Sequence, residues 1–252
     1  MSGSDVEAGL WLRRFHQADA GAPGLICFPP AGGSASWFHP MSAALAPDVD
    51  VVAMQYPGRQ DRRAEDPIDD VVVLAYRISR ILSGATGWPV AFFGHSVGAT
   101  VAFEVARALV AADGAGPAHL LVSGRRAPTR HRDEHVHRRD DAGILQDLRR
   151  LGGTDARVLG DDDVIRLVLP ATRADYRAAE TYRYVAGPLL TCPVTALTGD
   201  DDPSTTLDEA AGWREVTTGA FELRVFPGGH FFLTRHLDEI VRLIGERLGT
   251  AA

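Results

Sequence analysis

The segment Gly94-His95-Ser96-Val97-Gly98 constrains this chain more than any other, because of the segments that flank it. A short apolar, β-prone run, 89–93, precedes it, and apolar residues at helical spacing, 99–110, follow it. A Gly-x-Ser-x-Gly motif between a strand and a helix is typical of a nucleophile elbow, a sharp turn that strains the serine backbone and exposes its Oγ. The following helix directs its N-terminal N–H groups toward charge that develops on a substrate. The motif alone is common in Gly-rich chains, but this context predicts that Ser96 is a catalytic nucleophile.

Further apolar, β-prone runs recur along the chain, with helical stretches between them. Apolar strands separated by helices indicate an α/β protein with a mostly parallel central sheet and helices on both faces. In such sheets the reactive groups gather at the carboxyl ends of the strands. The expected strands are 24–28, 49–55, 90–93, 119–123, 193–198 and 221–226.

The segment 125–188 interrupts this alternation, because it contains no strand-like run. Helical periodicity predicts helices over 141–151, 163–169 and about 172–184. A helical insertion between two strands, placed after the elbow, is most simply a lid over the active site. The alternative is a small packing subdomain with no gating role. We expect one domain over 1–252, with the helical lid subdomain at about 125–188.

A serine hydroxyl needs a base, an acid that orients the base, and an oxyanion hole. In folds with a nucleophile elbow, the acid and then the histidine follow the serine along the chain. His230 lies in a Gly-rich loop after a predicted strand and is the predicted general base. The acid comes from three adjacent carboxylates after another strand, and the residues alone leave the choice open between Asp200, Asp201 and Asp202.

Backbone N–H groups from two segments are expected to form the oxyanion hole. One belongs to Val97, the residue after the nucleophile. The other comes from the loop 29–34, where Ala31 is the first residue after two prolines that has an N–H to donate. The glycines at 32 and 33 would let this loop approach a substrate closely.

Charge and composition limit the class of partner. The chain has 252 residues, of which 45% are hydrophobic, and a formal net charge of −7, which argues against nucleic acid as the main partner. The acidic N-terminus leads into no apolar signal segment and no run reaches membrane-spanning length, so we expect a cytoplasmic protein without membrane contact. Cys27 and Cys192 are expected to be reduced thiols. The cluster His131, His135 and His137 has no recognised ligand spacing, so no metal site is expected.

Distinct motifs occur in order along nearly the whole chain: Trp11-Leu-Arg-Arg-Phe15, Cys27-Phe-Pro-Pro-Ala-Gly-Gly-Ser34, Gln55-Tyr-Pro-Gly-Arg59, Phe93-Gly-His-Ser96, Leu148-Arg-Arg-Leu-Gly-Gly-Thr154, Leu169-Pro-Ala-Thr-Arg-Ala-Asp175 and Gly228-Gly-His-Phe-Phe232. Together they resemble the discrete type II thioesterases that accompany polyketide and non-ribosomal peptide synthetases. The resemblance implies the α/β-hydrolase fold with a helical lid insertion. In that superfamily the acid commonly falls three residues after the glycine that closes its strand, which selects Asp202. The sequence departs from the family at Val97, where methionine is frequent, and at Thr172, where a larger apolar residue is expected.

The resemblance also implies an activity: hydrolysis of acyl groups from the phosphopantetheine arm of acyl or peptidyl carrier proteins, which edits stalled or wrongly primed chains. It implies that Ser96 attacks the thioester, with His230 as base and Asp202 as its orienting acid. The N–H groups of Ala31 and Val97 would hold the oxyanion. No metal or diffusible cofactor is implied. The alternatives are a carboxylesterase or lipase, an acyltransferase with the same triad, or a non-catalytic acyl-binding relative.

Clusters of arginine are the expected contact for carrier proteins, which are generally acidic. Since the chain is acidic too, attraction must come from a local basic patch. Arg125 and Arg126 begin one cluster, which continues to Arg139 at the start of the insertion, and Arg59 begins a second. We expect one of these clusters to lie near the pantetheine entrance. The alternative is a solvated charged loop, because acidic residues are interleaved with the first cluster.

Overall fold

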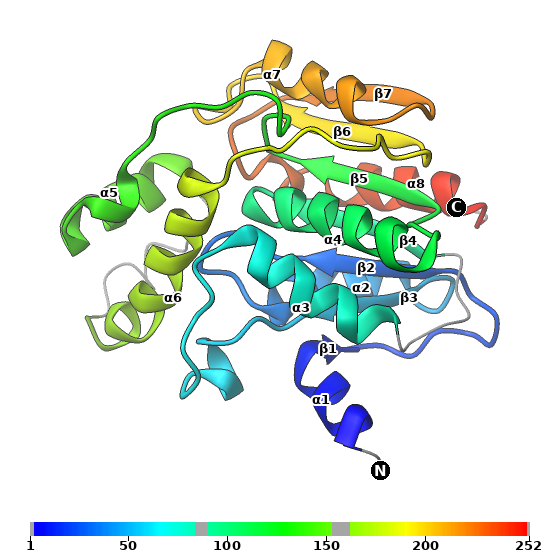
Figure 1. Ribbon diagram of the computed structural model, residues 1–252, viewed down its shortest axis with the longest axis horizontal. Helices are drawn as coiled ribbons and strands as arrows, with labels where there is room; N and C mark the ends of the chain where they lie inside the picture. Colours follow the sequence, from blue (N-terminus) through cyan, green and yellow to red (C-terminus); the bar gives the residue numbers. More distant parts are fainter. Residues whose placement is uncertain (1–2, 84–89, 153–161, 251–252) are drawn as a thin grey trace.

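A seven-stranded sheet forms the centre of the computed structural model (Figure 1), which describes residues 3–83, 90–152 and 162–250. The strand order is β1-β3-β2-β4-β5-β6-β7, and every neighbouring pair is parallel except β1 with β3. The predicted α/β class and the mostly parallel sheet are therefore confirmed. The strands are β1 Leu12–Arg13, β2 Gly24–Phe28, β3 Asp50–Met54, β4 Val90–His95, β5 His119–Ser123, β6 Val194–Gly199 and β7 Phe221–Phe226.

The register of the strands brings their carboxyl ends to one edge of the sheet. Phe28 at the end of β2 pairs with Gly94, and His95 at the end of β4 pairs with Ser123 at the end of β5. On the other side of β5, Gly199 pairs with Phe226, so β6 and β7 also end together. The loops that follow β2, β4, β6 and β7 consequently leave the sheet at the same edge, where Figure 1 shows α5 and α6.

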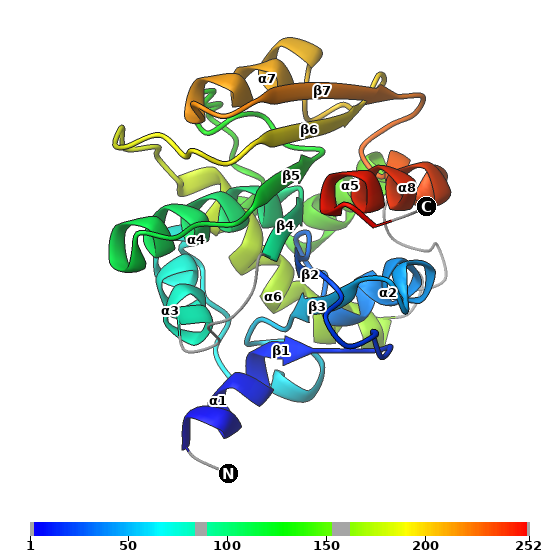
Figure 2. The same cartoon turned by 90° about the vertical axis from the view of Figure 1, so that its right-hand side faces the viewer.

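Helices cover both faces of the sheet, because alternate residues of each buried strand face opposite sides. Ile26 and Phe92 belong to the core cluster that contains α3 and α4, whereas the adjacent Leu25 and Phe93 pack with α2 and α8. Figure 2 shows these two helix pairs on opposite sides of the sheet. The helices outside the insertion are α1 Gly3–Trp11, α2 His39–Leu45, α3 Val71–Ser83, α4 Val97–Asp113, α7 Leu207–Ala211 and α8 Leu237–Leu248.

All six expected strands are present, with small differences at their ends. β4 continues two residues beyond the expected 90–93, to His95, because the glycine at 94 still pairs in the sheet. Pro89, which begins the apolar run before the elbow, lies outside the described residues. Sequence reasoning missed β1, since two residues are too few to show a period, and this strand pairs antiparallel with β3 at the sheet edge.

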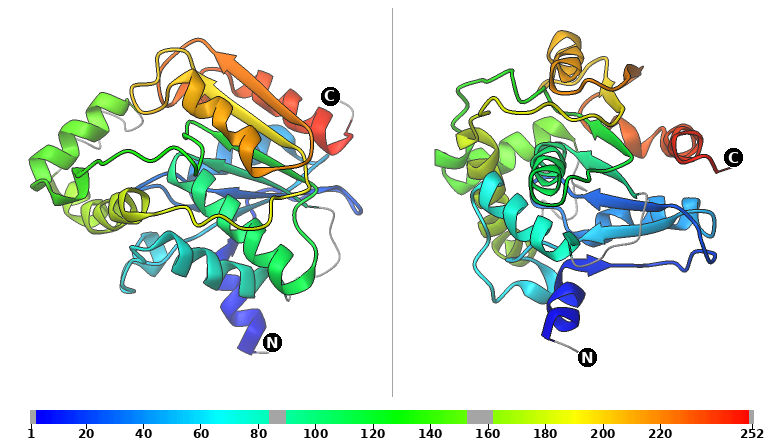
Figure 3. Two further views of the ribbon diagram at one scale, coloured as in Figure 1. Left: turned by 45° about the horizontal axis from the view of Figure 1, so that its top comes forward. Right: turned by 45° about the vertical axis from the view of Figure 1, so that its right-hand side comes forward.

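The segment between β5 and β6 is helical, as expected, and contains α5 Asp141–Leu151 and α6 Asp162–Thr181. The two helices lie next to each other in both views of Figure 3. α5 matches its prediction, with Asp140 as N-cap accepting from the N–H of Gly143. Residues 153–161, including the end of the motif 148–154, lie outside the described part of the chain.

The prediction of separate helices over 163–169 and about 172–184 is wrong. α6 is one helix that continues through Pro170 and ends at Thr181. Pro170 removes one backbone donor from the helix, which disfavours its continuation. Burial on both sides overrides this preference, because Leu169, Ala171 and Ala178 all lie in the interior. The hydroxyl of Thr172 also donates to the carbonyl of Val168 at 2.8 Å.

The tight turn at the start of α4 predicts that adding a methyl group at Gly98 strongly destabilises the protein. A Cβ on Gly98 would lie 2.1 Å from the carbonyl oxygen of Phe28 and 2.6 Å from that of Pro29, both of them backbone atoms. Gly98→Ala should therefore lower the free energy of unfolding by about 2 kcal/mol or more. Urea unfolding followed by circular dichroism measures the change.

The matched control is Gly9→Ala, because a Cβ on this helical glycine in α1 would meet nothing within 4 Å. Its free energy of unfolding should stay within about 1 kcal/mol of the wild-type value. Equal urea midpoints for the two variants would contradict the tight packing at the elbow.

Candidate active site

Ser96 lies in the strained turn that the sequence predicts. Its backbone has φ +56° and ψ −126°, in a region that non-glycine residues rarely adopt, and α4 begins at the next residue. The neighbouring glycines are sterically required: a Cβ on Gly94 would lie 2.4 Å from the carbonyl oxygen of Gly98. The N–H of Ser96 donates to the carbonyl of Ser123 at 2.8 Å, which fixes the turn to the end of β5.

His230 and Asp202 form a buried pair at the same edge of the sheet. Nδ1 of His230 lies 2.9 Å from Oδ2 of Asp202, and the two side chains are 3% and 0% exposed. The second oxygen of Asp202 accepts from the backbone N–H of Ser204 at 2.8 Å. Since a carboxylate only accepts, Nδ1 carries the proton, and Nε2 of the neutral ring is left as the acceptor, the state a general base requires.

The three adjacent carboxylates have different surroundings. Asp200 accepts a hydrogen bond from the N–H of Gly228 at 2.8 Å, which stabilises the loop that carries His230. Asp201 is exposed, and only its backbone N–H bonds to this loop, at the carbonyl of Gly228. Asp202 is the carboxylate that reaches the imidazole. Asp202 is therefore the one of the three carboxylates that is placed to orient His230, and it remains the predicted acid.

Close backbone approaches bring these loops together. A Cβ on Gly199 at the end of β6 would lie 2.2 Å from the carbonyl oxygen of Gly228. The loop that carries Asp202 therefore packs directly on the loop that carries His230. A Cβ on Gly124, which follows the acceptor of the Ser96 N–H, would lie 3.4 Å from Cε1 of His230. Ser96 and His230 therefore both adjoin the residues 123–124 at the end of β5.

The two amides expected in the oxyanion hole also adjoin each other. The start of α4 touches the carbonyls of Phe28 and Pro29, which lead into the loop that carries Ala31. Within the described residues, neither the N–H of Ala31 nor that of Val97 donates a hydrogen bond. In contrast, the N–H of Gly32 donates to Asp175 of α6 at 2.8 Å. Two unused donors near a strained serine are the arrangement that an oxyanion requires.

His95 is a buried histidine of the elbow that packs rather than binds. Its ring stacks on Trp37 at 5.4 Å and lies 5.1 Å from the ring of His230. Its Nδ1 bonds the hydroxyl of Ser123 at 3.0 Å, and no described residue bonds its Nε2. Burial, reinforced by the nearby His230, holds the pKa of His95 well below its usual value, so the ring is neutral at pH 7.

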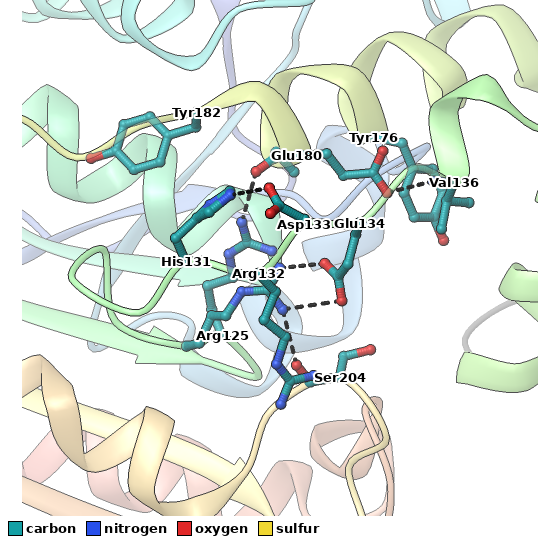
Figure 4. A network of polar contacts seen from close by, with 12 residues as sticks. Arg125, His131, Arg132, Asp133, Glu134, Val136, Tyr176, Glu180, Tyr182 and Ser204 are labelled. Atoms are coloured by element: carbon teal, nitrogen blue, oxygen red, sulfur yellow. Dashed lines mark hydrogen bonds and ion pairs between the residues drawn. The ribbon is translucent and has the colours of Figure 1, made fainter.

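The arginines expected to dock a carrier protein point inward instead. The guanidinium of Arg59 is 6% exposed and pairs with both oxygens of Asp175. Arg126 is equally buried, and it bonds Glu134 and the carbonyl of Ser204. Figure 4 labels these two partners. Arg125 donates to Thr100 and to the carbonyl of Ala179, and burial lowers its pKa to about 10. Arg59 and Arg126 are buried and Arg125 is half-buried, so their guanidinium groups offer little surface to a carrier protein.

The structure also shows the surroundings of the two cysteines and of the residues at the start of the insertion. Cys27 and Cys192 are free thiols whose pKa values are raised by burial, for Cys192 to about 11. Glu180 of α6 accepts from the N–H of Val136 and bonds His137, which ties the start of the insertion to α6. Across residues 3–83, 90–152 and 162–250, no group of His, Cys, Asp or Glu side chains is arranged to hold a metal ion. No helix in this part of the chain is long and apolar enough to cross a membrane.

The elbow, the strand order and the buried histidine–carboxylate pair define an α/β-hydrolase. The chain belongs to the family described as thioesterase domain, whose model matches residues 23–248. It is accordingly a hydrolase of the class that acts on thioesters, as the sequence motifs predict.

Several proteins similar to this chain are named as thioesterases. The chain is 50% identical to thioesterase PikA5 of Streptomyces venezuelae over 248 residues, which is 97% of this chain and 87% of that protein. Its structure resembles the type II thioesterase BorB from the borrelidin biosynthetic cluster, with a TM-score of 0.90, 52% identity and coverage of 95% and 98% of the two chains. It also resembles RedJ, a thioesterase from the prodiginine pathway of Streptomyces coelicolor, with a TM-score of 0.86, 37% identity and coverage of 93% and 94%.

The separate surroundings of the three carboxylates predict different effects of the same substitution. Asp202→Asn should lower kcat by about 10⁴-fold, because an amide no longer fixes the imidazole tautomer or stabilises its protonated form. Steady-state hydrolysis of a small acyl thioester measures this loss. Asp201→Asn is the control, since its side chain is exposed, and it should leave kcat unchanged. A larger loss in Asp201→Asn than in Asp202→Asn would reassign the acid.

Proposed function

We propose that this chain hydrolyses acyl groups from the phosphopantetheine arm of acyl or peptidyl carrier proteins, and so edits chains during polyketide or non-ribosomal peptide biosynthesis. The observation that carries the proposal is the buried pair of His230 and Asp202 beside the strained Ser96. The substrate class rests on the relatives, since BorB is named as a type II thioesterase of a biosynthetic cluster and RedJ as a thioesterase of a biosynthetic pathway. The carrier proteins of such a system are the proposed partners, and the cytoplasm is the proposed location.

The proposed reaction proceeds through an acyl-enzyme. His230 takes the proton of the Ser96 hydroxyl as the serine oxygen attacks the thioester carbonyl. The N–H groups of Ala31 and Val97 hold the oxyanion of the tetrahedral intermediate. When the C–S bond breaks, His230 returns its proton to the pantetheine thiolate.

Hydrolysis repeats these steps with water as the nucleophile. His230 removes a proton from a water molecule that attacks the acyl carbonyl, and the second tetrahedral intermediate collapses with release of the fatty or polyketide acid. The proton on His230 returns to the oxygen of Ser96, which regenerates the enzyme. Each step uses groups of this chain and water, and the phosphopantetheine belongs to the substrate.

The helical segment with α5 and α6 is proposed to act as a lid. It lies beyond the carboxyl edge of the sheet, and α6 contacts the loop that carries Ala31 through Asp175. His230 is 3% exposed, so an acyl-pantetheine arm needs an opening beside this segment to reach the imidazole. A cover of this kind excludes water from the acyl-enzyme until the thiol has left.

Mass spectrometry of a carrier protein tests substrate class and nucleophile together. An acyl-carrier protein incubated with the wild type should lose the mass of its acyl group, whereas incubation with Ser96→Ala should leave that mass unchanged. The matching oxygen ester of N-acetylethanolamine, compared with the thioester of N-acetylcysteamine, separates a thioesterase from a carboxylesterase. Equal deacylation by wild type and Ser96→Ala would refute the mechanism, and faster cleavage of the oxygen ester would favour the carboxylesterase.

Carrier docking is proposed to use arginines of the first cluster that remain at the surface. Arg138 and Arg139 are exposed at the start of the insertion, unlike Arg125 and Arg126. The double variant Arg138→Glu/Arg139→Glu should raise KM for an acyl-carrier protein about tenfold, because charge pairs at an interface mainly change association. KM for an acyl N-acetylcysteamine should not change. An equal change for both substrates would contradict docking at this site.

A further inference from the structure

A buried ion pair connects the insertion with the loop that carries the proposed oxyanion donor. Asp175 of α6 is 3% exposed, and both of its carboxylate oxygens are occupied. Oδ1 accepts from Nη2 of Arg59 at 3.0 Å, and Oδ2 accepts from Nη1 of Arg59 and from the N–H of Gly32, each at 2.8 Å. Sequence reasoning assigned no role to Asp175 and placed Arg59 on a docking surface.

Arg59 also donates hydrogen bonds directly to the loop after β2 and to the loop after β3. Nη1 of Arg59 also donates to the carbonyl of Gly33 at 3.0 Å, and its Nε donates to the carbonyl of Pro57 at 3.3 Å. The pair therefore fixes a donor of one residue and an acceptor of the next, within a loop that has no regular secondary structure. Three segments meet here: the loop after β2, the loop after β3, and α6.

The bonded residues belong to the turn that surrounds Ala31. The N–H of Gly33 donates to the carbonyl of Pro30 at 2.9 Å, which closes a four-residue turn with Ala31 and Gly32 at its centre. Gly32 has φ +69°, typical of the third position of a type II turn. Asp175 accepts from the central peptide of this turn, so it stabilises one orientation of a peptide that otherwise interconverts between turn types. Ala31, whose N–H is unused, contributes the carbonyl half of that peptide.

The pairing with Arg59 also reduces the negative charge that Asp175 brings close to the oxyanion hole. A lone carboxylate next to an oxyanion hole repels the charge that develops there, and a buried carboxylate without a partner is costly in itself. The bidentate guanidinium neutralises Asp175 while leaving it able to accept from Gly32. The result is a fixed acceptor with little net charge beside the reaction centre.

We propose that Asp175, with Arg59 as its counterion, is a positioning residue that holds the turn around Ala31 in the geometry the oxyanion hole requires. The proposal rests on the proposed function, because it assigns Ala31 to that hole. It makes the catalytic geometry depend on a residue of the insertion: the hole is complete only while α6 lies against the loop.

Kinetics of Asp175 variants test the proposal on an acyl N-acetylcysteamine. Asp175→Ala should lower kcat and kcat/KM by a similar factor of about 10², since a misplaced oxyanion donor weakens the transition state and leaves ground-state binding intact. Asp175→Asn, which keeps the shape and one acceptor oxygen, should lose about tenfold. Affinity for a trifluoromethyl ketone with the same acyl chain should fall by the same factor as kcat/KM, because its adduct with Ser96 places an oxyanion in the hole.

Asp147→Ala is the matched control. Asp147 is also a buried carboxylate of the insertion, paired with Arg150 and bonded by the hydroxyl of Tyr176, but no interaction connects it with the loop after β2 among the described residues. It should lower thermal stability about as much as Asp175→Ala while leaving kcat within about threefold of the wild type.

The outcomes separate the two proposals. Equal losses of kcat in Asp175→Ala and Asp147→Ala, a change confined to KM, or an unchanged affinity for the ketone would overturn the positioning role. If Asp175→Ala does not fold, the isosteric Asp175→Asn carries the same comparison. A wild-type protein that cleaves no acyl thioester would instead overturn the proposed function.

Discussion

The contact of Gly98 with the carbonyl oxygens of Phe28 and Pro29 is the constraint on which the site depends. It brings the first turn of α4 against the end of β2 at a distance that admits no side chain. The strand register then places Ser96 beside Ser123, because β4 and β5 end together. One close approach thus sets the serine, the amide of Val97 and the loop of Ala31 relative to one another. The strained φ of Ser96 follows from this packing, since the chain must turn within a single residue to enter α4.

Burial and hydrogen bonds distinguish the polar groups near the serine. The side chain of Asp202 is fully enclosed, and its two oxygens bond His230 and the N–H of Ser204. His95 lacks any acidic partner, so burial keeps it neutral. The two imidazole rings are only 5.1 Å apart, but among the described residues only His230 has a carboxylate partner.

Local sequence patterns predicted most of the fold. The features that they missed depend on contacts between residues far apart in the sequence. The six expected strands and α5 followed from apolar periodicity, and the order of serine, acid and histidine along the chain followed from the expected topology. Local sequence could not show that Asp200 reaches Gly228 while Asp202 reaches His230, because all three carboxylates precede the same turn. The prediction of two separate helices over 163–169 and 172–184 failed for a related reason: α6 continues through Pro170 because tertiary burial, which helix propensity does not show, stabilises it.

The arginines show most clearly where composition misleads. A cluster of basic residues in an acidic chain suggests a surface that attracts an acidic partner, but Arg59 has its counterion 116 positions away in α6. A guanidinium enclosed with a carboxylate contributes nothing to the outer field, and its energy depends on geometry more than on charge. The same pairing connects the insertion directly to the loop 29–34. Gly32 of this loop also lies against the side chain of Thr172 in α6. A Cβ on Gly32 would lie 2.5 Å from Oγ1 of Thr172, so α6 and the loop approach each other too closely for a side chain at position 32.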